Sequence, residues 1–469
     1  MHTAAAEREL PYIFPDEDLP LVEYKGGGVL SMAASVDLFL ATFSSSWFTG
    51  PTVHSWSGSA SISIEPPPGC RWLGGVHVDR SDARRVLALA VVDEADADQA
   101  RAGYALLCSI DAAAFATHAA ADDKAADDEH ERLASLVQVR STPFCPRVAL
   151  VTRDRGMPHS IAQIPGCTVV LTGDGVLWFF DDADHTLAPT TVELLAFVGV
   201  ASKRFASALS VAAHGDRVFA RVGAAHLFVA TRHAVEFALF VPDASTGACD
   251  VPLALSPSGD CVVTSDGSHV LVFDVVALDE RANTLGWGNR EHFDRWGQGQ
   301  VWEPGSFFSR ASFALQMRHR MFFSDCGVAS VGFVGAGGAV MNESATLMLM
   351  DTKKPTCNFP LRWWHATSDV NELYDEARVH AAAGKFVFFG SNGRTPETHD
   401  HPAIMRVHVA DLVGLRARAF TIAVALQSLC LPAWITLLIA QAACVGSEFV
   451  PLNFVWQLVT KIKHGTEGK

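Results

Sequence analysis

The stretch that decides the fold is residues 161–182, IAQIPGCTVVLTGDGVLWFFDD. It contains an apolar run, a Pro-Gly turn, a second apolar run over Thr168–Thr172, a Gly173-Asp174-Gly175 turn and a third run that ends at Asp181. Short runs rich in valine, leucine and phenylalanine, bounded by Asp-Gly or Gly-Asp dipeptides, are typical of antiparallel strands joined by tight turns. The stretch therefore predicts three consecutive antiparallel strands.

The same layout recurs along the chain. Residues 253–275, LALSPSGDCVVTSDGSHVLVFDV, repeat it with an Asp266-Gly267 turn. Weaker copies occupy residues 72–111, 209–230, 329–351 and 376–393, the last with an Asn392-Gly393 turn. The N-terminal stretches 26–43 and 57–64 supply either one more unit or closing strands.

Self-similarity at a period of roughly 40 to 60 residues is the signature of a β-propeller. Closing many short sheets into a ring leaves only short, protected edges. We therefore expect an all-β fold, a six-bladed or seven-bladed β-propeller over residues 30–411. An N-terminal segment, 1–29, precedes it, and a short α-helical segment, 412–469, follows it. The Asp-Gly and Asn-Gly turns at 174–175, 266–267 and 392–393 are expected at corresponding positions of their blades.

Composition limits the function classes. The chain has 469 residues, of which 49% are hydrophobic and 19% charged, so it can bury a large core. Its 36 lysine and arginine residues against 51 aspartate and glutamate residues give a net charge of −15. Because an acidic surface repels phosphate backbones, a nucleic-acid partner is disfavoured.

The cysteines and the N-terminus favour a reducing compartment. None of the ten cysteines lies closer to another than the twelve positions from Cys249 to Cys261, which excludes a CxxC pair. The first twenty residues are acidic and lack the apolar core of a signal peptide. We expect an intracellular protein, cytoplasmic or nuclear. No Gly-x-Ser-x-Gly, Walker A or HExxH motif appears, so no catalytic residue, cofactor or metal is predicted.

Three insertions are expected between the blades, at 111–133, 276–323 and 394–403. The first combines alanine with acidic residues and is typical of a solvated helix or loop. Tryptophan and arginine dominate the energetics of protein interfaces. The candidate partner-binding residues are therefore Trp287, Trp296, Trp302, Arg310, Arg318, Arg320, Trp363 and Trp364. The alternatives are core or inter-blade packing for the tryptophans and a solvated surface patch for the arginines.

The C-terminal stretch 419–447 has no charged side chain. Gln427, Ser428, Pro432 and Gln441 divide it into apolar helices shorter than the ~20 residues that a membrane span requires. We expect two helices buried against protein, with a membrane anchor as the alternative.

The segment Gly166–Phe180 resembles the repeat of the regulator of chromosome condensation (RCC1-like) family of seven-bladed propellers. The shared features are a Gly, an apolar strand, an Asp-Gly turn and an apolar-aromatic strand. Residues 285–304 and 388–393 are similar to the loop that follows that strand. The family's histidine is replaced by Cys167 and Cys261. Its terminal glycine is replaced by aspartates that look instead like the closing residue of WD40 blades, namely Asp181, Asp274 and Asp351.

This resemblance implies a non-enzymatic protein-protein interaction scaffold with a protein partner. Regulation of a small GTPase is one role that it implies. The tail offers an alternative: Leu431-Pro432, followed by Val455-Trp456, is similar to an F-box, which implies the substrate receptor of a ubiquitin ligase. A second alternative is a propeller hydrolase or a tail-anchored membrane protein. The oligomeric state stays open.

Overall fold

The structure is a computed structural model that describes a defined part of the chain. The described residues are 12–13, 29–34, 39–44, 50–55, 61–79, 82, 84–92, 105–115, 117, 135–144, 159–184, 187–199, 209–223, 225–241, 252–277, 307–309, 313–322, 328–334, 337–342, 346–350, 359–363, 377–383, 386–391 and 404–408. They are almost entirely β structure, and helix α4, Leu194–Phe197, is one short turn.

Within these residues the strands form seven sheets, antiparallel apart from one parallel pair. The first sheet contains β2 (Val29–Ala34), β3 (Phe39–Ser44), β4 (Pro51–Ser55) and β5 (Ser61–Ser63). The second contains β6 (Cys70–Val78), β7 (Arg85–Val92), β8 (Ala105–Asp111) and β9 (Gln138–Phe144). The third contains β10 (His159–Ile164), β11 (Cys167–Thr172), β12 (Val176–Asp181) and β13 (Thr190–Glu193).

The remaining four sheets follow in chain order. The fourth contains β14 (Leu209–His214), β15 (Arg217–Val222), β16 (His226–Ala230), β17 (Val235–Phe240) and β21 (Phe307–Ser309). The fifth contains β18 (Leu253–Leu255), β19 (Cys261–Ser265), β20 (His269–Ala277) and β22 (Phe313–Phe322). The sixth contains β23 (Val328–Val334), β24 (Gly337–Asn342), β25 (Thr346–Met350), β26 (Phe359–Trp363) and β1 (Tyr12–Ile13). The seventh contains β27 (Ala377–Ala383), β28 (Phe386–Ser391) and β29 (Ile404–His408).

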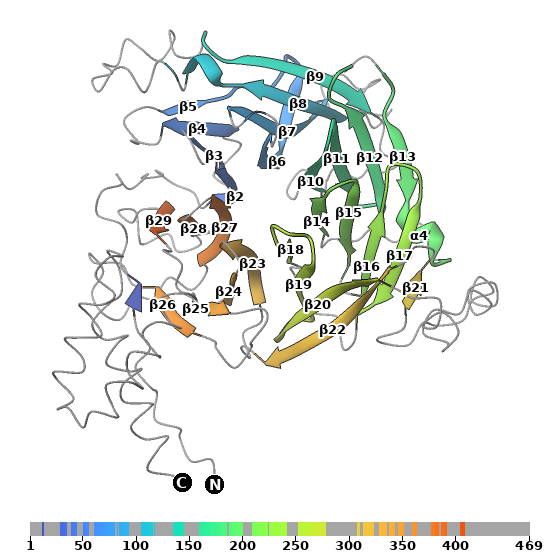
Figure 1. Cartoon of the computed structure of the whole chain (residues 1–469). Coiled ribbons are helices and arrows are strands. Elements are labelled where there is room, and N and C mark those ends of the chain that lie inside the picture. Colours follow the sequence, from blue (N-terminus) through green and yellow to red (C-terminus); the bar gives the residue numbers. More distant parts are fainter. Residues whose placement is uncertain are drawn as a thin grey trace, which may run out of the picture.

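The sheets are arranged around a common centre (Figure 1). The first strand of each sheet contacts the first strand of the next, in the order β2, β6, β10, β14, β18, β23, β27. β27 also contacts β2, so the sequence of contacts returns to its start. Each sheet therefore packs between two neighbours.

Packing on both faces explains the composition of the strands. All six residues of β11, CTVVLT, are buried, because one face meets the second sheet and the other the fourth. A strand buried on both faces reads as a continuous apolar run, whereas a strand with one solvated face alternates. The same holds for β19, CVVTS, which is buried throughout. The apolar runs that decided the fold are thus strands in the interior of the ring.

The predicted strands and turns of the decisive stretch are confirmed. Residues 159–181 form three antiparallel strands, β10 to β12. Gly175 has φ +73°, a conformation that favours glycine. A Cβ there would also lie 2.7 Å from Cγ of Leu195, so the site excludes larger residues on two counts.

The related turns and the N-terminal unit also agree with the sequence. Gly267, in the turn between β19 and β20, has φ +109°. Both turns join the second and third strands of their sheets, as predicted. The Asn392-Gly393 turn lies outside the described residues, but β28 and β29 on either side of it hold the same two places. The N-terminal stretches 26–43 and 57–64 contribute to the first sheet, together with β4.

The expected insertion at 276–323 was wrong in part. β20 continues to Ala277, and β22 pairs with β20 as the outermost strand of the fifth sheet. β21 pairs with β17 and becomes the fifth strand of the fourth sheet. The physical reason is burial, because Phe313, Ala314 and Leu315 lie in the core between these two sheets. A plain loop would expose those side chains.

The expected N-terminal segment, 1–29, contains a short strand, β1, which pairs with β26 in parallel.

Within the expected insertion 111–133, residues 113–115 have helical conformation, and Phe115 is buried. The rest of that segment, apart from residue 117, and the segments 394–403 and 412–469 lie outside the described residues. In the described part of the chain, no helix has the length and apolar character to cross a bilayer.

Candidate functional site: a cleft between the second and third sheets

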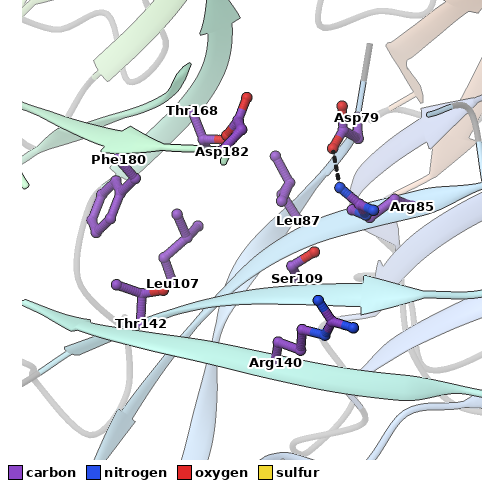
Figure 2. Close-up of a pocket in the computed structure, with 10 residues that line it drawn as sticks. All are labelled: Asp79, Arg85, Leu87, Leu107, Ser109, Arg140, Thr142, Thr168, Phe180 and Asp182. Carbon is purple, nitrogen blue, oxygen red and sulfur yellow. Dashed lines mark hydrogen bonds and ion pairs between the residues drawn. The ribbon is translucent and has the colours of Figure 1, made fainter. Parts of the chain in front are cut away.

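A cleft opens between the second and third sheets (Figure 2). It measures about 360 Å³ when the space open to solvent is included. Five strands, β7, β8, β9, β11 and β12, line it together with the residues that directly follow β6 and β12. The lining residues are Asp79, Arg85, Leu87, Leu107, Ser109, Arg140, Thr142, Thr168, Phe180 and Asp182. Charged groups from both sheets thus meet at one opening.

The alternation of β9 places its side chains in this cleft. Successive residues of a strand point to opposite faces, so Arg140, Thr142 and Phe144 share one face. Phe144 fixes which face that is, since its ring lies 5.2 Å from the rings of both Trp178 and Phe180 in the third sheet. Arg140 and Thr142 therefore point toward the third sheet as well, as Figure 2 shows.

The floor of the cleft is apolar. Leu87, Leu107 and Phe180 are buried there and belong to the core shared by the two sheets. Thr142 and Thr168 are buried beside them. An apolar floor with polar groups around it is the arrangement of core and rim found at protein interfaces.

Most polar groups of the rim already have partners in the chain. Arg85 Nη1 lies 3.4 Å from the Asp79 carboxylate, whose side chain is only 3% exposed. Thr168 Oγ1 donates a hydrogen bond of 2.7 Å to Asp182 Oδ1. These interactions hold the two walls in shape and reduce the charge that a ligand would meet.

Arg140 differs from the other charged residues of the cleft. It is exposed on the outermost strand of the second sheet. Within the described residues it forms no ion pair. An arginine guanidinium recognises carboxylates through two parallel hydrogen bonds. The arrangement is therefore suited to binding an acidic side chain that lies over the apolar floor.

The structure places two of the predicted partner-binding residues elsewhere. Arg318 and Arg320 lie on β22 in the fifth sheet. Arg318 Nε donates to Asp274 at 2.7 Å, and Arg320 Nε donates to Asp266 at 3.0 Å. Both guanidinium groups therefore have carboxylate partners within their own sheet. Their role in partner binding stays a prediction.

The structure does not describe the side chains of the other predicted partner-binding residues. Trp363 is the last residue of β26, and only its backbone is described. Outside the described residues lie Trp287, Trp296, Trp302, Arg310 and Trp364. In the described part of the chain, no group of three or more histidine, cysteine, aspartate or glutamate side chains is placed to hold a metal.

A buried charge cluster occupies the junction between the fourth and fifth sheets. Arg221 on β15 is fully buried, and burial lowers its pKa to about 9, while Asp266 acts in the opposite direction. Asp266 also holds Arg320, and its carboxylate is 1% exposed. His226 lies on the other face of the fourth sheet, against Phe228 and Phe240, and its pKa is lowered to about 4, first by burial and then by Arg221. Arg221 and Asp266 are thus charged groups buried where the fourth and fifth sheets meet.

Sequence reasoning did not select Arg140 or Arg221. The signal for Arg140 was present in QVRSTPF, residues 138–144, where an arginine precedes a threonine and a phenylalanine at intervals of two. That pattern predicts which residues share one face of the strand, but it does not predict which sheet that face contacts. Arg221 lies in RVFARV, residues 217–222, where the apolar residues predict burial and the two arginines do not. The partner of Arg221 is 45 positions away in another repeat, which a single sequence does not reveal.

Comparison with known proteins supports the fold. No protein-family model and no curated protein sequence matches the chain. Raptor from Chaetomium thermophilum superimposes with a TM-score of 0.50 and 10% identity, over 85% of this chain and 30% of that chain. A chain of the mitotic checkpoint complex gives a TM-score of 0.47 and 9% identity, over 88% of this chain and 96% of that chain. Both are proteins that contain β-propellers of the WD40 type.

The fold is a β-propeller. The likeness to Raptor and the ring of strand contacts agree on this point. At 10% identity the likeness shows the fold alone, so the function has to be argued from the cleft.

Proposed function

We propose that this chain is a non-enzymatic protein-protein interaction scaffold built on a seven-bladed β-propeller. The seven sheets of the described residues and the contact between β27 and β2 support the blade number. The acidic composition and the spacing of the cysteines support an intracellular location. Structural neighbours that belong to protein complexes are compatible with such a role.

The observation that carries this proposal is the exposed guanidinium of Arg140 over an apolar floor. Arginine is enriched at protein interfaces because its planar group pairs with carboxylates and packs on apolar surface at the same time. The neighbouring charges are paired within the chain, which leaves Arg140 as the charge that a partner would meet first. An acidic segment of another protein fits this arrangement.

The experiment is affinity purification of the full-length protein from cells, followed by mass spectrometry, with two variants of equal charge change. Arg140→Gln removes one positive charge in the cleft. His233→Glu adds one negative charge at an exposed position in the hairpin between β16 and β17, on a different sheet. We expect Arg140→Gln to lose a set of partners that His233→Glu retains. If the full-length protein captures no partner above background, the scaffold proposal is wrong.

The identity of the captured partners also separates the finer alternatives. The resemblance of residues 166–180 to the RCC1-like repeat supports a regulator of a small GTPase, and recovery of such a GTPase is the expected result for that role. The F-box-like residues 431–456 support a substrate receptor of a ubiquitin ligase, for which a ligase adaptor is expected. A partner set that contains neither would leave the plain scaffold role.

A further inference from the structure

Among the described residues, the outermost strand of the second sheet, β9, has no neighbouring strand along its outer edge. β9 pairs with β8 over its whole length, from Gln138 to Phe144, in one continuous register without a bulge. In the described part of the chain it forms no backbone hydrogen bond other than those of this ladder. Its first four residues, Gln138 to Ser141, are exposed. Figure 1 shows the strand at the outer rim of the ring.

The backbone groups that face outward can be identified from the ladder on the other side of β8. Ala112 donates its N–H to the carbonyl of Arg84, which places this pair in the bonded position between β7 and β8. Bonded and non-bonded pairs alternate in an antiparallel ladder. The even-numbered residues of β8 therefore bond to β7, and the odd-numbered ones bond to β9.

The register between β8 and β9 then shows which residues of β9 bond to β8. Ser109 pairs with Arg140, so Arg140 bonds inward, and Val139 and Ser141 turn their N–H and C=O groups outward. Pro143 agrees with this assignment, because proline has no N–H to give and is tolerated in a strand only where that group would face away. The outer edge thus offers two complete donor-acceptor pairs, at Val139 and Ser141.

Other outer strands of this molecule show how such an edge can be covered or interrupted. β17 is covered by β21, and β26 is covered by β1, each a short strand from a distant part of the chain. β22 is interrupted by a register shift opposite Val272 and Phe273, and its arginines pair with its own sheet. A covering strand and a bulge are two of the features that protect an edge from pairing. Among the described residues, β9 has neither a covering strand nor a bulge; β5, β13 and β29 share this, but they have three, four and five residues against the seven of β9.

The side chains of β9 indicate what kind of strand would fit. A residue opposite Arg140 in an added strand occupies a narrow, non-bonded pair, in which side chains lie closest. An acidic side chain in that place would pair with the guanidinium. Val139, 39% exposed, favours a β-branched neighbour on the other face.

We propose that β9 binds an extended segment of a partner protein by strand addition, with an acidic side chain of that segment opposite Arg140. This inference rests on the proposed scaffold function and names the chemistry of its partner. The added strand would contribute main-chain hydrogen bonds to Val139 and Ser141, which supply affinity, and the pair with Arg140 would supply specificity.

The test is selection of a random nine-residue peptide library displayed on phage against the full-length protein, followed by affinity measurement of the selected peptides. Val139→Pro removes an outward N–H without breaking the ladder to β8. Val139→Thr keeps both the N–H and the branched shape. Arg140→Glu reverses the charge at the specificity position, and His233→Glu is the control for net charge.

The selected peptides are expected to combine β-branched residues with an acidic residue at a fixed position. Their affinity should fall at least about tenfold in Val139→Pro and in Arg140→Glu, and stay unchanged in Val139→Thr and His233→Glu. Selection of no peptide would overturn the proposal, as would equal binding by parent and Val139→Pro. Should Val139→Pro fail to fold, Arg140→Glu decides the question alone.

The same variants separate this inference from the scaffold function. If cellular partners are captured by the parent and equally by Val139→Pro and Arg140→Glu, strand addition at β9 is wrong while the scaffold function stands. If the parent captures none, the scaffold function itself fails.

Discussion

Two junctions between neighbouring sheets are used in opposite ways. Between the second and third sheets, polar walls leave a cleft, and Arg140 is exposed at its rim. Between the fourth and fifth sheets, Arg221 is fully buried near Asp266, which also holds Arg320. Phe313 of the fifth sheet adds a stacked contact of 6.0 Å with Phe237 of the fourth. The same repeat thus produces one open junction and one closed junction.

The two turns that correspond in the repeat show how small the difference is. Asp174 accepts a hydrogen bond of 2.6 Å from Thr172, and its other oxygen is buried without a hydrogen bond. Asp266, in the equivalent turn, lies beside Arg320 and His269 and acts on Arg221. One carboxylate completes a hairpin, whereas the other neutralises a cation from the neighbouring sheet. Asp266 has this second role because Arg221 and Arg320 lie near it.

The largest expected effect is loss of the buried carboxylate at the closed junction. Asp266→Asn would remove the carboxylate that offsets the charge of fully buried Arg221 and that pairs with Arg320, and loss of one member of a buried charge cluster costs about 3 kcal/mol or more. Asp174→Asn is the matched substitution and should change the free energy of unfolding by less than about 1 kcal/mol, since an amide oxygen still accepts from Thr172. Urea unfolding measures both. Equal destabilisation would contradict the distinction between the two turns.

Acid should weaken the fold through His226, which lies on the opposite face of the fourth sheet from the closed junction. The pKa of this histidine is about 4 in the folded protein, against an ordinary value of 6.5. Between these pH values the unfolded chain binds the proton and the folded one does not, so stability falls as the pH falls. The loss is about 1.4 kcal/mol per pH unit for each such histidine. Buried His54, whose pKa is also about 4, contributes in the same direction.

His226→Phe isolates the contribution of His226. The ring of His226 stacks on Phe228 at 5.8 Å and meets Phe240 edge-on at 5.4 Å, so phenylalanine is a close replacement. Unfolding free energies measured between pH 7 and 5 should decrease less steeply in this variant than in the parent. Identical slopes would show that the histidine takes up its proton equally in both states.

How far the sequence predicts these junctions follows from the range of each interaction. The strands β11 and β12 and the Asp174-Gly175 turn depend on residues within a few positions of each other, so the apolar runs and glycines are sufficient. The pairing of β21 with β17 spans about 70 residues, and the sequence was interpreted there as an insertion. Arg318 and Arg320 were recognised as a basic cluster, but their partners Asp274 and Asp266 come into reach only through the β20–β22 register. The cleft was not predictable, because it needs the relative position of two sheets.

The smallest expected effects come from one arginine at each junction, Arg320 at the closed one and Arg140 at the open one. Arg320→Ala removes an ion pair with a carboxylate that is 1% exposed, and we expect a loss of about 1 kcal/mol in unfolding free energy. Arg140→Ala removes an exposed charge and should stay within about 0.5 kcal/mol of the parent. Thermal unfolding at one salt concentration compares them directly. A larger effect for Arg140 would mean that this residue holds the fold rather than a partner.

Hydrogen exchange on the full-length protein tests the central claim most directly, measured with and without a peptide selected on the parent. Backbone amides of residues 138–144 are compared with those of residues 313–322 on β22. We predict slower exchange in 138–144 when the peptide is bound, because the outward amides of Val139 and Ser141 become bonded, and no change in 313–322. Slower exchange on β22, or unchanged exchange on β9, would contradict the assignment of the open junction as the binding edge.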